Sequence, residues 1–417
     1  MTGKERVQTV LSHREADTIA LDFGATPVTG IHVKMVAAFR RHYGLEDRPV
    51  KVTEPFQMLG EVDDELTKIW NIDVIGVGGR SDMFGHPQRD FVEKRMPWGQ
   101  TVLLPQSFKT KEENGNIYVF PQGDTDCLPT AVMPEGGYFF DAIERTPATE
   151  LDAELNIEDN MEEFALMTDA DMPYWKEALT KARASGRAVI ANIGGTGFGD
   201  IALVPGLNLK NPTGIRAIAD WYMSTVMRTD FVQEIFKRQT EIALHNLEKV
   251  KQIAGDCIDV LFVCGTDFGT QDSQFCSAED LSALHGKAYR TINDWVHRHT
   301  GWKTFKHSCG AIVPLIETFI DCGFDIINPV QINAKDMNPH FLKEQFGDRI
   351  SFWGGGIDTQ RMLQVGTPQQ VKDQVRQLCE IFGAGGGFVF NTIHNIQANV
   401  PMENAFALMD AICEIRK

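Results

Sequence analysis

The sequence predicts a single α/β domain with the architecture of a (β/α)8 TIM barrel, interrupted by a hairpin and loop excursion. Three observations support this fold class. Short apolar runs alternate with longer stretches of helical period from about residue 185 onward. The runs are apolar on both faces, which is typical of parallel strands covered by helices. Seven or eight such units in one chain fit a closed barrel better than an open, doubly wound sheet.

Eight segments are predicted to be strands because each is a short apolar run bounded by turn-forming or polar residues. Six follow the regular alternation, and two lie earlier in the chain. The first is predicted either as a strand or as a segment that caps the barrel. In chain order they are residues 19–24, 72–77, 187–195, 257–265, 302–310, 324–330, 350–356 and 386–392.

Segments of helical period separate these strands. Ser277 and Thr367 stand where N-caps belong, with acidic residues or Gln after them, and so mark two helix starts. The predicted helices cover residues 215–253, 277–299, 311–322, 339–346, 367–382 and 402–416.

Residues 95–180 break the alternation and form the predicted excursion within one domain spanning 1–417. Asn114-Gly115 is a strong signal for a hairpin turn. An acidic stretch follows at 150–164, and we expect the whole excursion to pack near the barrel mouth. The glycine run at 194–199 comes after a mid-chain strand, so it is a weak signal for dinucleotide binding.

Composition excludes several classes of function. The net charge of −17, without a stripe of Lys and Arg, argues against a nucleic-acid partner. No stretch of about 18 uncharged apolar residues predicts a membrane span, and the charged N-terminus does not read as a signal peptide. Eight scattered cysteines with no CxxC pair favour reduced thiols. We therefore expect a cytoplasmic protein.

Polar residues at the ends of the predicted strands are the candidates for a site, because barrel enzymes carry their chemistry at the C-terminal ends of the strands. Asp267 lies in a glycine-rich loop, where it is either a turn-forming residue or a site residue. The candidates are Asn192, Asp267, His307, Cys309, Asn328, Gln331, Asp358, Gln360, Asn391 and His394.

His307 and Cys309 are two apart, so their side chains share one face of a strand. An imidazole nitrogen and a sulfur at that spacing can converge on one ion, and zinc suits mixed N/S ligation. The alternative is a strand that ends in two buried residues without a metal. His394 follows another predicted strand and would supply a third nitrogen, which leaves a fourth position for substrate or water.

Three stretches resemble the uroporphyrinogen decarboxylase superfamily: HSCGAIVPLIETFIDCGFDIINPVQ, FWGGGIDTQRMLQVGTPQQVKDQV and GGFVFNTIHNIQANVPMENAFALMDAI. Within it the chain is more similar to the cobalamin-linked methyltransferases. The resemblance is firm over 257–417, looser over 1–94 and poor over 95–180. It implies a (β/α)8 barrel, in agreement with the strand pattern. It also implies a dimer, as a family-level expectation.

The resemblance implies that His307 and Cys309 match the zinc-binding His-x-Cys pair of these methyltransferases. It places His394 where they usually have Cys and where decarboxylases have His. An acidic residue of the coenzyme M transferases falls near Gln331. The amide here weakens an inference of thiol activation.

The decarboxylases themselves carry an Arg-Gln-Ala-Gly-Arg motif that grips the carboxylates of their substrate, a task suited to guanidinium groups. Arg40 and Arg41 stand in the corresponding region without forming the motif. This departure favours the methyltransferase branch.

The sequence thus predicts a zinc-dependent methyltransferase that moves a methyl group between a small substrate, preferably a methyl ether, and a corrinoid carried by a partner protein. Asp267, Gln331 and Asn391 are its candidate catalytic residues, beside the metal ligands His307, Cys309 and His394. Two alternatives stay open. One is a decarboxylase acting on a tetrapyrrole or another carboxylate, and the other is a non-catalytic protein that binds a tetrapyrrole or corrinoid.

Overall fold

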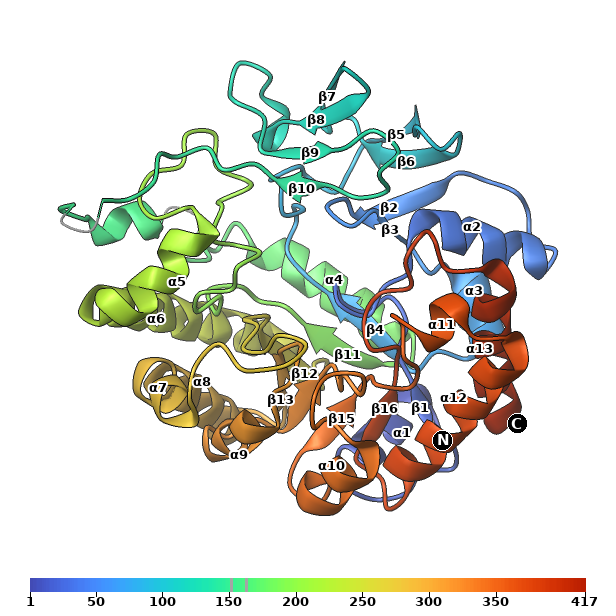
Figure 1. Cartoon of the computed structure of the whole chain (residues 1–417). Coiled ribbons are helices and arrows are strands. Elements are labelled where there is room, and N and C mark those ends of the chain that lie inside the picture. Colours follow the sequence, from blue (N-terminus) through green and yellow to red (C-terminus); the bar gives the residue numbers. More distant parts are fainter. Residues whose placement is uncertain (151–152, 162–163) are drawn as a thin grey trace.

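A computed structural model describes residues 1–150, 153–161 and 164–417 and contains an eight-stranded parallel barrel. The order of neighbouring strands is β1-β16-β15-β14-β13-β12-β11-β4 (Figure 1). Each strand falls within one of the eight predicted segments, so the predicted fold class is confirmed. The strands are β1 (Ala20–Leu21), β4 (Val74–Val77), β11 (Ala188–Ala191), β12 (Val260–Cys264), β13 (Lys303–His307), β14 (Ile326–Asn328), β15 (Ser351–Trp353) and β16 (Phe388–Phe390).

The first predicted segment is a barrel strand, since β1 pairs in parallel with β16. At its other edge β1 meets the start of β4. The Asp73 backbone N–H donates to the Leu21 carbonyl at 2.9 Å, and the Leu21 N–H donates to the Asp73 carboxylate at 2.9 Å. These contacts join the two outermost strands and bring the barrel close to closure.

Helices cover the outside of the barrel as the sequence predicts, but two of the predicted helices are each divided in two. The predicted helix 277–299 divides at His285 into α7 and α8. The predicted helix 215–253 divides at Arg228, whose φ of −133° and ψ of 43° are not helical. Ser277 and Thr367 are N-caps whose side chains accept from the backbone N–H groups of Asp280 and Gln370. The barrel helices are α4 (Met172–Ala184), α5 (Ile218–Met227), α6 (Thr229–Ala254), α7 (Ala278–Leu284), α8 (Gly286–His299), α9 (Val313–Asp321), α10 (Pro339–Phe346), α11 (Met362–Val365), α12 (Pro368–Gly383) and α13 (Met402–Ile415).

The barrel interior is filled with apolar side chains at the N-terminal ends of the strands. Helix α1 (Gly3–Val10) contributes Val7 and Val10 to this cluster, and Leu11 follows directly. The strands contribute inward residues that include Phe262, Phe305 and Trp353. Because this end is plugged, space for a site remains only at the C-terminal ends of the strands.

Two four-stranded sheets lie over one side of the barrel, and the predicted excursion supplies β6 to β10 of them (Figure 1). Helices α2 (Val33–His42) and α3 (Asp64–Trp70) lie near the first sheet. That sheet contains β2 (Val50–Glu54), β3 (Leu59–Gly60), β5 (Phe91–Arg95) and β6 (Thr101–Pro105), and the second contains β7 (Thr110–Glu113), β8 (Asn116–Val119), β9 (Ala131–Met133) and β10 (Asp141–Ala142).

The predicted turn at Asn114-Gly115 is confirmed, with φ of 51° and 77° at the two residues. Positive φ at both central positions is the geometry that matches strand twist in a two-residue hairpin. The two arms of the hairpin are β7 and β8, and the preceding strand β6 pairs with β5 and β2.

The predicted boundaries of the excursion stay a prediction, although two details bear on them. Helix α4 packs on α6 and β4 of the barrel, so its residues 172–180 belong with the barrel helices. Within the acidic stretch, residues 151–152 and 162–163 lie outside the described part of the chain. Among the described helices, none is long and apolar enough to cross a membrane.

Candidate metal centre at the barrel mouth

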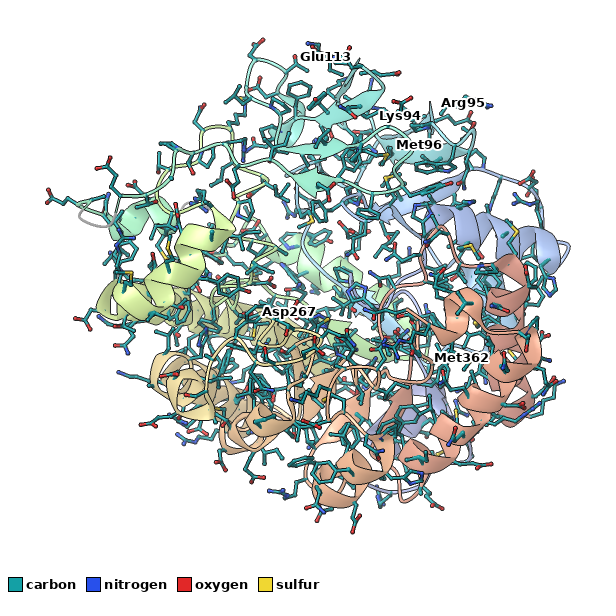
Figure 2. All side chains as sticks on the ribbon, viewed as in Figure 1. Lys94, Arg95, Met96, Glu113, Asp267 and Met362 are labelled. Carbon is teal, nitrogen blue, oxygen red and sulfur yellow. The ribbon has the colours of Figure 1, made fainter. Side chains whose placement is uncertain are left out.

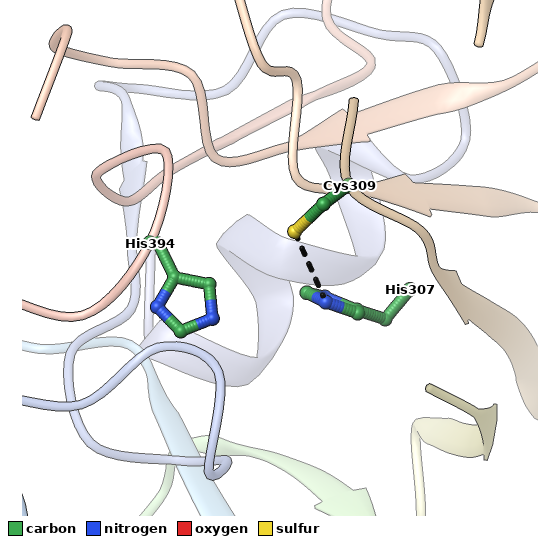
Figure 3. Close-up of side chains that lie close together, drawn as sticks. All are labelled: His307, Cys309 and His394. Carbon is green, nitrogen blue, oxygen red and sulfur yellow. Dashed lines mark hydrogen bonds between the residues drawn. The ribbon is translucent and has the colours of Figure 1, made fainter. Parts of the chain in front are cut away.

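Three side chains that the sequence singled out meet at the mouth of the barrel. His307 is the last residue of β13, Cys309 follows two residues later, and His394 lies in the loop after β16. One potential ligand atom from each lies within 4.8 Å of the other two (Figure 3). His307 Nε2 and Cys309 Sγ are 3.5 Å apart. That separation is roughly what two ligands of one tetrahedral zinc ion would have.

His307 is held in one orientation by its neighbour across the sheet. The register of β13 and β14 places Asn328 directly opposite His307, and His307 Nδ1 lies 2.6 Å from Asn328 Oδ1. The Asn328 amide donates through Nδ2 to the Trp353 carbonyl at 2.8 Å, which leaves Oδ1 as an acceptor. His307 Nδ1 therefore carries the proton, and the lone pair of Nε2 points toward Cys309.

His394 depends on a loop that is tied to the N-terminal part of the chain. The next residue, Asn395, accepts a hydrogen bond from Gly30 N–H at 2.5 Å and donates to the Pro27 carbonyl at 2.8 Å. Burial, with His307 nearby, lowers the pKa of His394 to about 4. The imidazole is therefore neutral near pH 7 and has a lone pair for a metal.

Cys309 is fixed through its backbone, since its N–H donates to Asp267 Oδ1 at 2.7 Å. Burial and the Asp267 carboxylate raise the pKa of the Cys309 thiol well above its usual value. Without a cation the group is a neutral thiol. A divalent ion beside the sulfur would favour the thiolate, so two imidazole nitrogens and this sulfur form a donor set that fits zinc.

Asp267 and Gln331, two of the predicted catalytic residues, both hold the segment that carries Cys309. Asp267 also lies 3.6 Å from His307 Nε2. Gln331 Oε1 accepts from the Gly310 N–H at 2.7 Å, and its Nε2 donates to Gln271 at 3.0 Å. Figure 2 shows Asp267 near the middle of the molecule in this view, while Glu113 lies at the outer edge.

Asn391, the third predicted catalytic residue, makes its hydrogen bonds elsewhere. Its amide donates to the Asp22 carbonyl at 2.7 Å and to the Thr29 carbonyl at 3.4 Å, which fastens the end of β16 to the N-terminal strand. Of the other strand-end candidates, Asn192 is exposed at the surface. Asp358 accepts from the backbone N–H groups of Gln360 and Arg361 and so shapes its own turn.

Two charged residues beside the site did not enter the sequence prediction. Lys306 is fully buried, donates to the Thr266 and His307 carbonyls at 2.6 and 2.5 Å, and lies over three aromatic rings. In the sequence, the signal for Lys306 was a charged residue inside an apolar strand. Asp200 directly follows the glycine run at 194–199, and this position in a loop after a barrel strand was its signal in the sequence.

We expect Asn328→Ala to weaken zinc binding by about 10- to 100-fold, because His307 would lose the acceptor that fixes its tautomer. Asn328→Asp keeps an acceptor and is expected to bind zinc at least as tightly as the wild type. Competition with a chromogenic chelator measures the affinities, with the exposed Asn192→Ala as control. Histidine ¹⁵N shifts of the metal-free protein report the tautomer, and an unchanged His307 tautomer in Asn328→Ala would contradict this account.

Comparison with known proteins finds a family model that matches the C-terminal part of the chain. The family model described as "Uroporphyrinogen decarboxylase (URO-D)" matches residues 218–415. Uroporphyrinogen decarboxylase from Pseudoalteromonas translucida is 35% identical over 100 residues, which are 24% of this chain and 26% of that protein. The enzyme from Psychromonas ingrahamii is 34% identical over 73 residues, 18% of this chain and 20% of that protein. The chain thus aligns with about a quarter or less of the length of these relatives.

A solved structure extends the likeness to the whole chain. A methyltransferase from Methanosarcina mazei superposes with a TM-score of 0.54 over 99% of both chains, at 13% sequence identity. At that identity the likeness establishes the shared barrel fold. The match over 218–415 makes this part of the chain similar to the uroporphyrinogen decarboxylase family, and the eight-stranded barrel is the fold that the chain shares with the superposed methyltransferase.

Proposed function

We propose that this protein is a zinc-dependent methyltransferase that moves a methyl group between a small substrate, preferably a methyl ether, and a corrinoid carried by a partner protein. The observation that carries the proposal is the convergence of His307, Cys309 and His394 within 4.8 Å at the barrel mouth. The superposition with a methyltransferase supports the same branch of the superfamily.

His307, Cys309 and His394 would hold the zinc ion through two nitrogens and one sulfur. When bound, zinc would act as a Lewis acid on a substrate oxygen, or would favour the thiolate form of a thiol substrate. The chain has its own part in this arrangement. Asn328 orients the His307 ring, and Asp267 and Gln331 fix the backbone at Cys309 and Gly310. A preorganised set of ligands of this kind leaves a fourth position for substrate.

The metal content of the purified protein tests the proposal. We expect about one zinc per chain by elemental analysis, and loss of that zinc in Cys309→Ala, because sulfur is the anionic ligand of the set. Cys413→Ala is the matched control, since Cys413 is a partly exposed cysteine at the far end of α13. A wild-type protein that is metal-free and fully active in methyl transfer would end the proposal.

Decarboxylation of a tetrapyrrole or another carboxylate is the second candidate, because the matching family and the curated relatives are described as uroporphyrinogen decarboxylases. The charges disfavour a polyanionic substrate. The Arg40 guanidinium contacts the Asp63 carboxylate and donates to the Glu46 carbonyl, so it is engaged within the fold. Asp267 adds negative charge beside the site. Unchanged activity after removal of the metal by a chelator would favour the decarboxylase.

A non-catalytic protein that binds a tetrapyrrole or corrinoid is the third candidate. Such a protein would keep its ligand affinity in His307→Ala, whereas the methyltransferase would lose activity in that variant. The corrinoid partner and a homodimer both belong to the proposal. Methyl transfer from a panel of donors to cob(I)alamin, with and without the partner protein, separates the candidates.

A further inference from the structure

Asp200 lies inside the barrel mouth, one strand away from His307. A Cβ atom on Gly265 would come within 2.5 Å of Asp200 Oδ2 and 3.8 Å of the Phe262 ring, so the carboxylate sits at the end of β12, near that ring. The Phe262 ring stacks on Phe305 at 5.2 Å, and His307 follows Phe305 by two residues on the same face of β13. Asp200 and His307 therefore lie at the same level of the barrel interior, next to the apolar cluster that fills the N-terminal ends of the strands.

The loop that carries Asp200 is fastened to the neighbouring strand. Thr266 donates through Oγ1 to the Gly197 carbonyl at 3.0 Å and to the Phe198 carbonyl at 3.2 Å. Asp200 Oδ1 accepts from the Ala202 N–H at 3.0 Å. Within the described residues Oδ2 has no hydrogen-bond partner. One oxygen thus fixes the carboxyl group, and the other is free for a ligand.

The surroundings shift the Asp200 carboxyl group toward its protonated form. Burial raises the pKa of Asp200, and the negative charge of Asp267 raises it further. His307 and Lys306 act in the opposite direction, but the pKa remains raised. The Tyr222 hydroxyl is buried with no partner in the described part of the chain. Its pKa is raised to about 12 by burial and by Asp267 and Asp200. This wall of the site thus carries the neutral Tyr222 hydroxyl and a carboxyl group whose pKa is raised, near the candidate metal ligands.

Resting on the proposed function, we propose that Asp200 is the general acid of the reaction and that the substrate is a methyl ether whose oxygen leaves as an alcohol or phenol. The electron pair of Co(I) forms a bond to the methyl carbon as the carbon–oxygen bond breaks. The bonding pair stays on oxygen, which takes the proton of Asp200. The products are the hydroxyl compound, methylated Co(III) corrinoid and an Asp200 carboxylate, which regains its proton from water.

Two ethers with different leaving groups test this role, using zinc-loaded protein and cob(I)alamin as acceptor. Demethylation of 2-methoxyphenol releases a poor leaving group, so Asp200→Asn is expected to lower the transfer rate with this ether by about 100-fold or more. With 4-nitroanisole, whose leaving group needs no proton, the loss is expected to stay below about threefold. Asp272→Asn, which removes an exposed carboxylate from the loop after β12, is the control and should leave both rates unchanged.

A second readout does not depend on turnover. The affinity for 2-methoxyphenol, measured by calorimetry without the acceptor, should change by less than about twofold in Asp200→Asn. Such a result would show that the binding site is intact. Equal loss with both ethers, or loss of binding, would assign Asp200 a structural role and overturn the inference. If the zinc-loaded wild type demethylates neither ether, the proposed function fails, and the role of Asp200 fails with it.

Discussion

Replacing His394 by alanine is expected to lower the affinity for zinc by on the order of 100-fold or more while the barrel stays folded. Removing even an outer partner of a zinc ligand typically costs 10- to 100-fold, so a lost ligand should cost at least as much. The loop itself should persist because Asn395, not His394, ties it to Gly30 and Pro27. Competition with a chromogenic chelator measures the affinity.

His394→Cys separates ligation from packing. A cysteine at this position restores the ligand that the related methyltransferases usually have, and we expect it to bind zinc within about tenfold of the wild type. Cobalt(II) substitution should show a stronger sulfur-to-metal absorption in this variant, since it holds two thiolates. His299→Ala is the control, because His299 is exposed on α8. Wild-type zinc affinity in His394→Ala would show that His307 and Cys309 bind without a third protein ligand.

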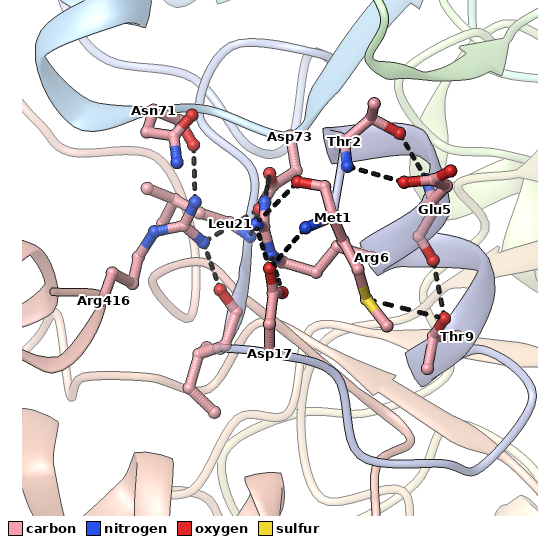
Figure 4. A network of polar contacts seen from close by, with 11 residues as sticks. Met1, Thr2, Glu5, Arg6, Thr9, Asp17, Leu21, Asn71, Asp73 and Arg416 are labelled. Atoms are coloured by element: carbon pink, nitrogen blue, oxygen red, sulfur yellow. Dashed lines mark hydrogen bonds and ion pairs between the residues drawn. The ribbon is translucent and has the colours of Figure 1, made fainter.

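Asp73→Asn is expected to lower the free energy of unfolding by about 3–5 kcal/mol, the range for breaking one partner of a buried ion pair. Asp73 is 1% exposed and contacts two guanidinium groups, those of Arg6 and Arg416, the latter at 2.8 Å (Figure 4). It also accepts from the Leu21 N–H where β1 meets β4. An amide would leave two buried cations without their shared anion at the seam of the barrel.

Asp17→Asn provides the matched control for Asp73→Asn. Asp17 pairs with the same Arg6, at 2.8 Å, but its side chain is 40% exposed. Solvent screens this pair, and we expect a loss of no more than about 1 kcal/mol. Urea denaturation followed by tryptophan fluorescence measures both variants. Equal effects of the two substitutions would show that the contacts of Asp73 with Arg416 and Leu21 contribute nothing beyond the ion pair with Arg6.

The fold could be predicted from the sequence because the patterns that indicate it are local. Apolar runs and helical stretches alternate with a period that a parallel barrel requires, and each of the eight strands falls in a predicted segment. Caps at Ser277 and Thr367 and the turn at Asn114-Gly115 depend on residues a few positions apart. The two small sheets were not predicted in detail. The first sheet combines β2 and β3 with β5 and β6, which lie some 40 residues later, and short strands leave no clear local pattern.

For the candidate site, the sequence by itself determined the His307–Cys309 pair, because two residues on one strand share a face whatever surrounds them. Tertiary structure decided the rest. The barrel brings His394 to the pair from a strand three positions away in the sheet, and the register of β13 and β14 sets Asn328 opposite His307. A loop anchored on Thr266 carries Asp200 to the same level of the barrel interior. These contacts depend on closure and register, which relate residues far apart in the chain and so leave no periodic trace in the sequence.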